Sequence, residues 1–161
     1  MDADDLAPVR LGITRLQRLF ASRRIHSNMA AAAGVHLSEQ ALQVLRTLAD
    51  GRSLPVGDLA RAARMDTGAV SRQLRTLEEQ ELVQRQSSPS HGSIVLVEAT
   101  REGRQTARRY EKVRSGQLAR ALEGWTPEER TELGRLLVRL VDDLQSTPYV
   151  DPDEDPKDDP A

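Results

Sequence analysis

The stretch LPVGDLARAARMDTGAVSRQLRTLEEQELVQRQSSPSHGSIVLVEAT, residues 54–100, decides the fold. It predicts two short helices joined by a tight turn and followed by a β-hairpin. Pro55 suits the first turn of a helix, which we expect from Val56 to Arg64. Asp66 has the chemistry of an N-cap for a second helix, from about Thr67 to Glu79. This order predicts a winged helix-turn-helix, mainly α with a small β-wing.

The second helix has one apolar and one polar face. Val70, Leu74 and Leu77 recur at helical spacing, so the residues on the far side face outward. Outward arginines can bind guanine through two hydrogen bonds or hold a phosphate, and small residues allow close approach to DNA. An amphipathic helix that is merely exposed to solvent is the alternative. The expected DNA contacts of this helix are Thr67, Gly68, Ala69, Ser71, Arg72, Arg75 and Thr76.

The hairpin is the expected wing. Segments with apolar and β-branched residues run from Leu82 to Gln86 and from Ile94 to Glu98. The turn-forming cluster at residues 87–93 separates them. This loop is too long for a two-residue turn, so we expect a projecting finger.

Residues from about 10 to 145 resemble the MarR family of bacterial transcription regulators. The residues that carry the resemblance are Asp66, Gly68, Ala69, Val70, Ser71, Arg72, Leu74, Leu77, Glu81, Leu82, Val83, Arg85, Thr100 and Gly103. The resemblance implies an obligate homodimer that binds an inverted repeat and usually represses transcription. It also implies that a small aromatic or phenolic effector lowers DNA affinity. The implied effector pocket draws on segments around Leu16 to Arg24, Leu37 to Gln43 and Tyr110.

The wing departs from the family pattern. Relatives commonly carry an aspartate and an arginine there, whereas this chain has Ser90-His91-Gly92-Ser93. Aligned without gaps, His91 takes the place of the aspartate and Ser93 that of the arginine. A partly protonated His91 can enter a narrow minor groove, or it is an exposed turn residue. With Arg85 from the resemblance, His91 and Ser93 complete the expected DNA contacts.

Composition excludes several kinds of site. The 161 residues suffice for one domain, and 38% of them are apolar. The chain has no cysteine, which excludes disulfides, thiolate metal sites and direct thiol sensing. His26, His36 and His91 lack metal-ligand spacing, so we expect no metal and no cofactor. The sequence has no nucleophile elbow, phosphate-binding glycine loop or paired histidine and carboxylate motif, which argues against an enzyme.

Charge is distributed unevenly along the chain. The formal net charge is −2, but residues 146–161 carry six acidic residues and one lysine, a net of −5. Residues 1–145 therefore carry +3. The segment 147–161 is rich in proline and poor in apolar residues, so we expect a disordered acidic tail. It either solubilises the chain or competes for its own basic DNA surface. The absence of a signal peptide and of a long apolar run predicts a cytoplasmic protein.

Helices at both ends favour a dimer. An N-terminal apolar stripe includes Ile13 and Phe20, Ser38 can cap a helix, and a basic helix is expected from about Arg101 to Glu123. Thr126, Pro127 and Glu129 form the strongest helix start in the chain. Leu133, Leu136, Leu137, Leu140, Val141 and Leu144 follow on one stripe. Such faces pair with a second copy or fold back on their own subunit.

We therefore expect four segments. These are an N-terminal dimerisation helix in residues 1–36, a winged helix-turn-helix DNA-binding domain in 37–100, C-terminal dimerisation helices in 101–146 and the tail. The expected function is that of a homodimeric, ligand-responsive repressor that binds pseudo-palindromic double-stranded DNA. The alternative is a winged-helix module for protein contacts or for non-specific chromosome binding.

Overall fold

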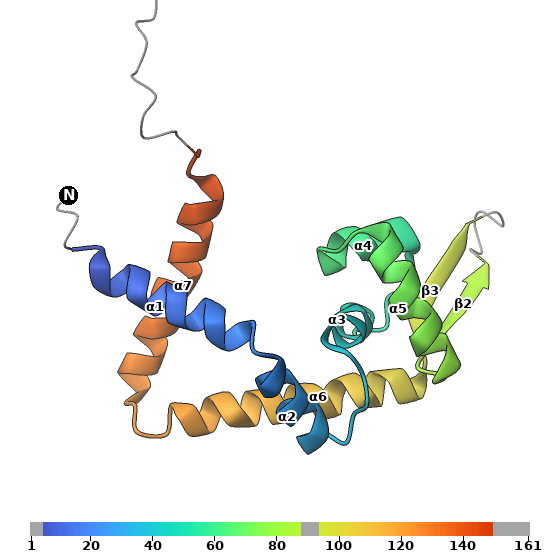
Figure 1. Ribbon diagram of the computed structural model, residues 1–161, viewed down its shortest axis with the longest axis horizontal. Helices are drawn as coiled ribbons and strands as arrows, with labels where there is room; N and C mark the ends of the chain where they lie inside the picture. Colours follow the sequence, from blue (N-terminus) through green and yellow to red (C-terminus); the bar gives the residue numbers. More distant parts are fainter. Residues whose placement is uncertain (1–4, 88–93, 150–161) are drawn as a thin grey trace, which may run out of the picture. The chain divides into compact units, whose positions relative to one another are not determined.

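The computed structural model describes residues 5–87 and 94–149 (Figure 1). It divides into two compact units, residues 1–117 and 118–161, with the boundary inside α6. The expected wing loop and most of the expected acidic tail lie outside the described residues. The described helices are α1 (Ala7–Phe20), α2 (Arg23–Ala32), α3 (Glu39–Thr47), α4 (Val56–Ala63), α5 (Thr67–Glu79), α6 (Arg101–Ala121) and α7 (Pro127–Ser146).

The first unit has its main core where α3, α4 and α5 meet. Leu45 of α3, Leu59 of α4 and Leu74 of α5 are each fully buried and belong to one apolar cluster. Figure 1 shows these three helices grouped beside the hairpin. Because each helix contributes one apolar stripe to a shared core, the predicted winged helix-turn-helix is confirmed.

The wing is a small antiparallel sheet of three strands in the order β1-β3-β2. β2 (Val83–Ser87) and β3 (Val95–Ala99) each begin and end one residue later than the sequence predicts. β1 (Leu54–Pro55) was not expected, and it pairs Leu54 with Val97 and Pro55 with Leu96. Pro55 therefore precedes α4 as its N-cap instead of lying in its first turn. Proline has no N–H to donate, and it is tolerated in an edge strand because the open side of the edge has no neighbouring strand that needs this hydrogen bond.

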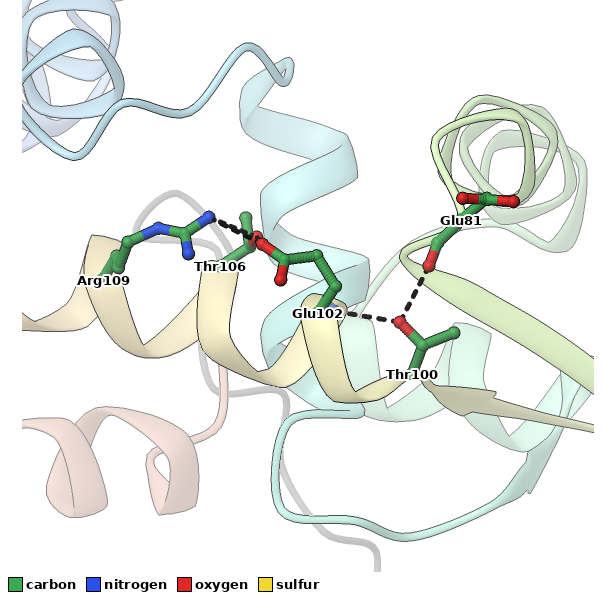
Figure 2. A network of polar contacts seen from close by, with 6 residues as sticks. Glu81, Thr100, Glu102, Thr106 and Arg109 are labelled. Atoms are coloured by element: carbon green, nitrogen blue, oxygen red, sulfur yellow. Dashed lines mark hydrogen bonds and ion pairs between the residues drawn. The ribbon is translucent and has the colours of Figure 1, made fainter.

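Polar contacts of Thr100 join the end of the wing to the start of α6 (Figure 2). Its hydroxyl donates to the carbonyl oxygen of Glu81 at 2.8 Å and accepts from the amide of Gly103 at 3.0 Å. Its amide donates to the carbonyl oxygen of Leu82 at 3.0 Å. Thr100 therefore fixes the first turn of α6 against the segment that leaves α5.

The N-terminal segment forms two helices where the sequence pattern indicates one. α1 ends at Phe20, and Ser22 has the extended backbone of an N-cap before α2. The Phe20 carbonyl oxygen, near the end of α1, accepts a hydrogen bond from His26 Nε2 at 2.7 Å. A side chain of α2 thus satisfies a backbone group at the helix break.

The second unit contains α7. Its start is the predicted capping box, in which the Thr126 side chain accepts from the Glu129 amide at 3.2 Å and Glu129 accepts from the Thr126 amide at 2.7 Å. No residue of α7 is buried in the described chain. Its exposed apolar residues are Leu136, Leu137, Val138, Val141 and Leu144.

Candidate nucleic-acid interface

A three-residue turn sets α5 against α4. Arg64 ends α4 in the left-handed conformation, with a φ of 52°. Asp66 then caps α5 by accepting a hydrogen bond from the amide of Ala69 at 2.7 Å. The predicted cap and both predicted ends of α5 are confirmed. Since the cap fixes where the helix begins, it also fixes which of its residues face outward.

The inner face of α5 is as the sequence predicts. Val70, Leu74 and Leu77 are fully buried and pack in the main core. The larger outer residues are exposed, including Arg72 and Arg75. Neither arginine forms an ion pair with another described residue. The helix therefore presents two guanidinium groups to solvent, each able to bind a phosphate or the edge of a guanine.

Small and hydroxyl-bearing residues surround these arginines. Thr67, Gly68 and Thr76 are exposed, and Ser71 is half-buried. The Ser71 hydroxyl donates to the carbonyl oxygen of Thr67 at 2.8 Å, which leaves its lone pairs as acceptors. A Cβ added at Gly68 would meet the capping carboxylate of Asp66 at 3.2 Å. Gly68 thus keeps the first turn of α5 open and free of crowding at its cap.

Ala69 corrects the predicted set. It is only 6% exposed, so its side chain does not face outward as expected. About 100° of rotation separates it from Val70, which places it on the flank of the buried stripe. A methyl group there is too short to reach past its neighbours. Ala69 contributes its amide to the Asp66 cap instead.

The structure describes only one of the three DNA contacts predicted in the wing. Arg85 on β2 is exposed, and its Nε donates to the Glu78 carboxylate of α5. This pair connects β2 to the end of α5, a contact that local spacing cannot predict. His91 and Ser93 lie outside the described residues. Arg64, exposed in the turn before α5, is a further cation beside the interface that the sequence pattern did not indicate.

A carboxylate on β3 organises the polar face of the sheet. Glu98 accepts hydrogen bonds from Gln84 Nε2 at 2.6 Å, Ser53 Oγ at 2.9 Å and Gln86 Nε2 at 3.1 Å. Hydrogen bonds from Gln84 and Ser53 lower the pKa of Glu98 below its ordinary value. Glu98 therefore stays ionised at neutral pH and holds side chains from β2 and from the segment before β1.

A cavity of about 680 Å³ lies beside α2 and the start of α3, within the first unit. Cationic or titratable groups line it at Arg23, His26 and Glu39, and His26 Nε2 lies 3.0 Å from Glu39 Oε1. Ala30, Ala31, Val35 and Leu42 provide apolar walls. The cavity overlaps the implied effector segments at Arg23 and from Leu37 to Leu42. Tyr110 does not line the cavity and is buried in a cluster with Leu42.

Comparison with known proteins agrees with this arrangement. Residues 37–92, which include α3, α4 and α5, match the model of the MarR family. The chain is therefore similar to the MarR family over its helix-turn-helix region. It is 28% identical over 121 residues to YxaD of Bacillus subtilis, an uncharacterized HTH-type transcriptional regulator, and the match covers 75% of this chain and 85% of YxaD.

Solved structures of other proteins have the same fold. A MarR-family transcriptional regulator from Silicibacter pomeroyi matches with a TM-score of 0.65 and 22% identity, over 92% of this chain and 100% of that one. FabT of Streptococcus pneumoniae, crystallised in complex with DNA, matches with a TM-score of 0.69 and 16% identity, over 89% of this chain and 98% of FabT. At these identities the likeness concerns the fold.

The described part of the chain thus has a winged-helix fold, and the relative YxaD is an HTH-type transcriptional regulator. The described residues contain no group of three His, Asp or Glu side chains placed to hold a metal ion. Among the described helices, none is both long and apolar enough to cross a membrane.

Proposed function

We propose that this chain is a homodimeric repressor of the MarR type that binds a pseudo-palindromic operator and responds to a small ligand. The exposed outer face of α5 is the feature that best supports sequence-specific DNA binding. Arg72 and Arg75 are exposed there, have no ion-pair partner among the described residues, and stand next to the small Gly68. A helix of this kind fits the major groove, where an arginine distinguishes guanine from the other bases.

Two unburied apolar faces support the homodimer. Neither α1 nor α7 has a buried residue in the described chain. Phe20 on α1 is 60% exposed and Val141 on α7 is 50% exposed. Packing against the same helices of a second subunit would remove these side chains from water. We assign the dimer contacts to the segments 1–36 and 101–146. Two-fold symmetry would then place two recognition helices about 34 Å apart, one turn of DNA.

The cavity beside α2 supports a small effector. Its volume falls within the range of small-molecule sites, and both polar and apolar side chains line it. Arg23 can pair with an acidic group, while Ala30, Val35 and Leu42 can pack against a ring. This chemistry fits the small aromatic or phenolic compounds that the family resemblance implies.

Ser93 favours a second candidate function. Because a serine stands where relatives commonly carry the minor-groove arginine, the wing would add less to specificity. The chain could then serve as a winged-helix module for non-specific chromosome binding or for protein contacts. Selecting bound sites from a random DNA pool, then titrating the selected site against random DNA, separates the two. A selected inverted repeat bound at least about 10³-fold more tightly supports the operator-binding repressor. Equal affinities for the selected site and for random DNA support the winged-helix module.

We expect Arg72→Ala to weaken binding to the selected operator by about 1–3 kcal/mol and to change binding to random DNA much less. The reason is that a guanidinium bound to a guanine edge is specific, whereas a phosphate contact is not. Fluorescence anisotropy on both DNAs at one salt concentration measures this. Arg61→Ala is a matched control, because Arg61 is an exposed arginine already paired with Asp58 on α4. Equal losses on both DNAs would assign Arg72 to a phosphate.

We expect Ser93→Arg to tighten DNA binding and to steepen its salt dependence by up to about one unit in the log–log slope. The added cation would release counterions from the DNA and can enter the minor groove. Anisotropy titrations at several salt concentrations measure both effects. Unchanged affinity and an unchanged slope would place the wing tip away from the DNA.

A further inference from the structure

One side chain of α5 forms hydrogen bonds to the start of α3. Gln73 of α5 accepts a hydrogen bond from Ser38 Oγ at 3.1 Å. Its Nε2 donates to Gln40 Oε1, also at 3.1 Å. Gln73 thus uses both ends of its amide on residues more than thirty positions earlier in the chain. We call this group, Ser38, Gln40 and Gln73, the α3–α5 clamp.

The same turn of α3 forms part of the cavity wall. Ser38, Glu39 and Gln40 all line the cavity. Ser38 also caps α3 by accepting from the Ala41 amide at 3.1 Å, and Glu39 contacts His26 across the cavity. A molecule in the cavity would therefore meet two of the three residues that form the clamp.

On the DNA side, the clamp acts next to the arginines that face the groove. Gln73 directly follows Arg72 and lies two residues before Arg75. Contacts to base edges depend on correct hydrogen-bond geometry, so a small rotation of α5 would weaken them. The buried stripe of Val70, Leu74 and Leu77 holds the helix in the core without the clamp. The clamp is thus suited to set the orientation of the helix more than its stability.

We propose that the α3–α5 clamp couples occupancy of the cavity to the DNA affinity of α5, with Gln73 as the positioning residue. This inference rests on the proposed function, since it assumes an effector in this cavity and DNA on α5. A molecule bound in the cavity displaces Ser38 and Gln40, which breaks their hydrogen bonds to Gln73. Without these bonds α5 can turn away from its DNA-binding orientation. A ligand can shift the equilibrium between the clamped and the released orientation of α5 only if it binds the two with different affinity. The clamp provides this difference, because two of its residues line the cavity.

A side chain can stand in for the unidentified ligand. Ala31 is exposed and lines the cavity, so Ala31→Phe places a ring there. Ala32, the next residue of α2, is exposed and does not line the cavity, which makes Ala32→Phe the matched control. Gln73→Leu keeps the approximate size of the side chain and removes both hydrogen bonds. Ala31→Leu is a smaller substitute if the phenylalanine variant does not fold.

We expect Ala31→Phe to lower affinity for the selected operator about 5- to 100-fold in the wild-type background. In the Gln73→Leu background the same substitution should change affinity less than about twofold, because the two sites are then uncoupled. Ala32→Phe should have no such effect in either background. An equal loss with and without Gln73, no loss in either, or an equal loss from Ala32→Phe would each overturn the proposal.

Amide hydrogen exchange of α5 tests the coupling without DNA. Filling the cavity should speed exchange in the first half of α5 in the wild-type background, and the Gln73→Leu background should show no further change. Unaltered exchange on Ala31→Phe would overturn the coupling. If the protein fails to distinguish the selected operator from random DNA, the proposed repressor function fails, while this measurement still decides on the clamp.

Discussion

The double substitution Leu137→Glu and Val141→Glu should convert the protein to a monomer and lower its operator affinity on the order of 10²-fold. Both side chains lie on the apolar face of α7, at 42% and 50% exposure, one helical turn apart. In the proposed dimer a second copy covers this face, so two carboxylates would be buried without partners. A monomer engages one half-site and loses the gain in affinity from binding two linked sites. Light scattering measures the mass, and fluorescence anisotropy measures the affinity.

The control for this variant is Arg139→Glu. Arg139 lies about 160° around α7 from both Leu137 and Val141 and is exposed. Its substitution makes the chain more acidic by the same two charge units as the double variant. It should leave the mass of the dimer unchanged. A double variant that remains dimeric would show that α7 folds back on its own subunit or takes no part in the interface.

Gly103→Ala should destabilise the protein by about 3 kcal/mol, the upper end of the usual cost of overpacking. A Cβ at this position would lie 1.9 Å from the carbonyl oxygen of Leu82, which is far closer than any van der Waals contact. That oxygen already accepts the Thr100 amide, so it cannot move without breaking the junction between wing and α6. Urea unfolding of the full chain at one fixed protein concentration measures the free energy of unfolding.

Gly57→Ala is the matched control, since a Cβ there would meet nothing within 4 Å. Gly57 lies in α4, so alanine should raise the free energy of unfolding by up to about 1 kcal/mol. If Gly103→Ala were as stable as Gly57→Ala, then the first turn of α6 would not pack on Leu82.

The sequence by itself determined the elements whose signals are local. Asp66 and Thr126 each cap a helix through an amide three residues later, and the stripe of Val70, Leu74 and Leu77 repeats within one helix. These interactions need only neighbours within about four positions, so they can be predicted before any tertiary structure is known. For the same reason the exposure of Arg72 and Arg75 followed from helical spacing alone.

Only the tertiary structure decided the features that depend on distant residues. β1 has two residues and exists because β3, more than forty positions later, pairs with it. Ala69 was expected to face outward, but it lies on the flank of the apolar stripe and its neighbours bury it. Gln73 lies on neither the apolar stripe nor the outer face of α5, and its role emerges only when α3 brings Ser38 and Gln40 to it. Chain folding sets such contacts, and no short-range pattern in the sequence encodes them.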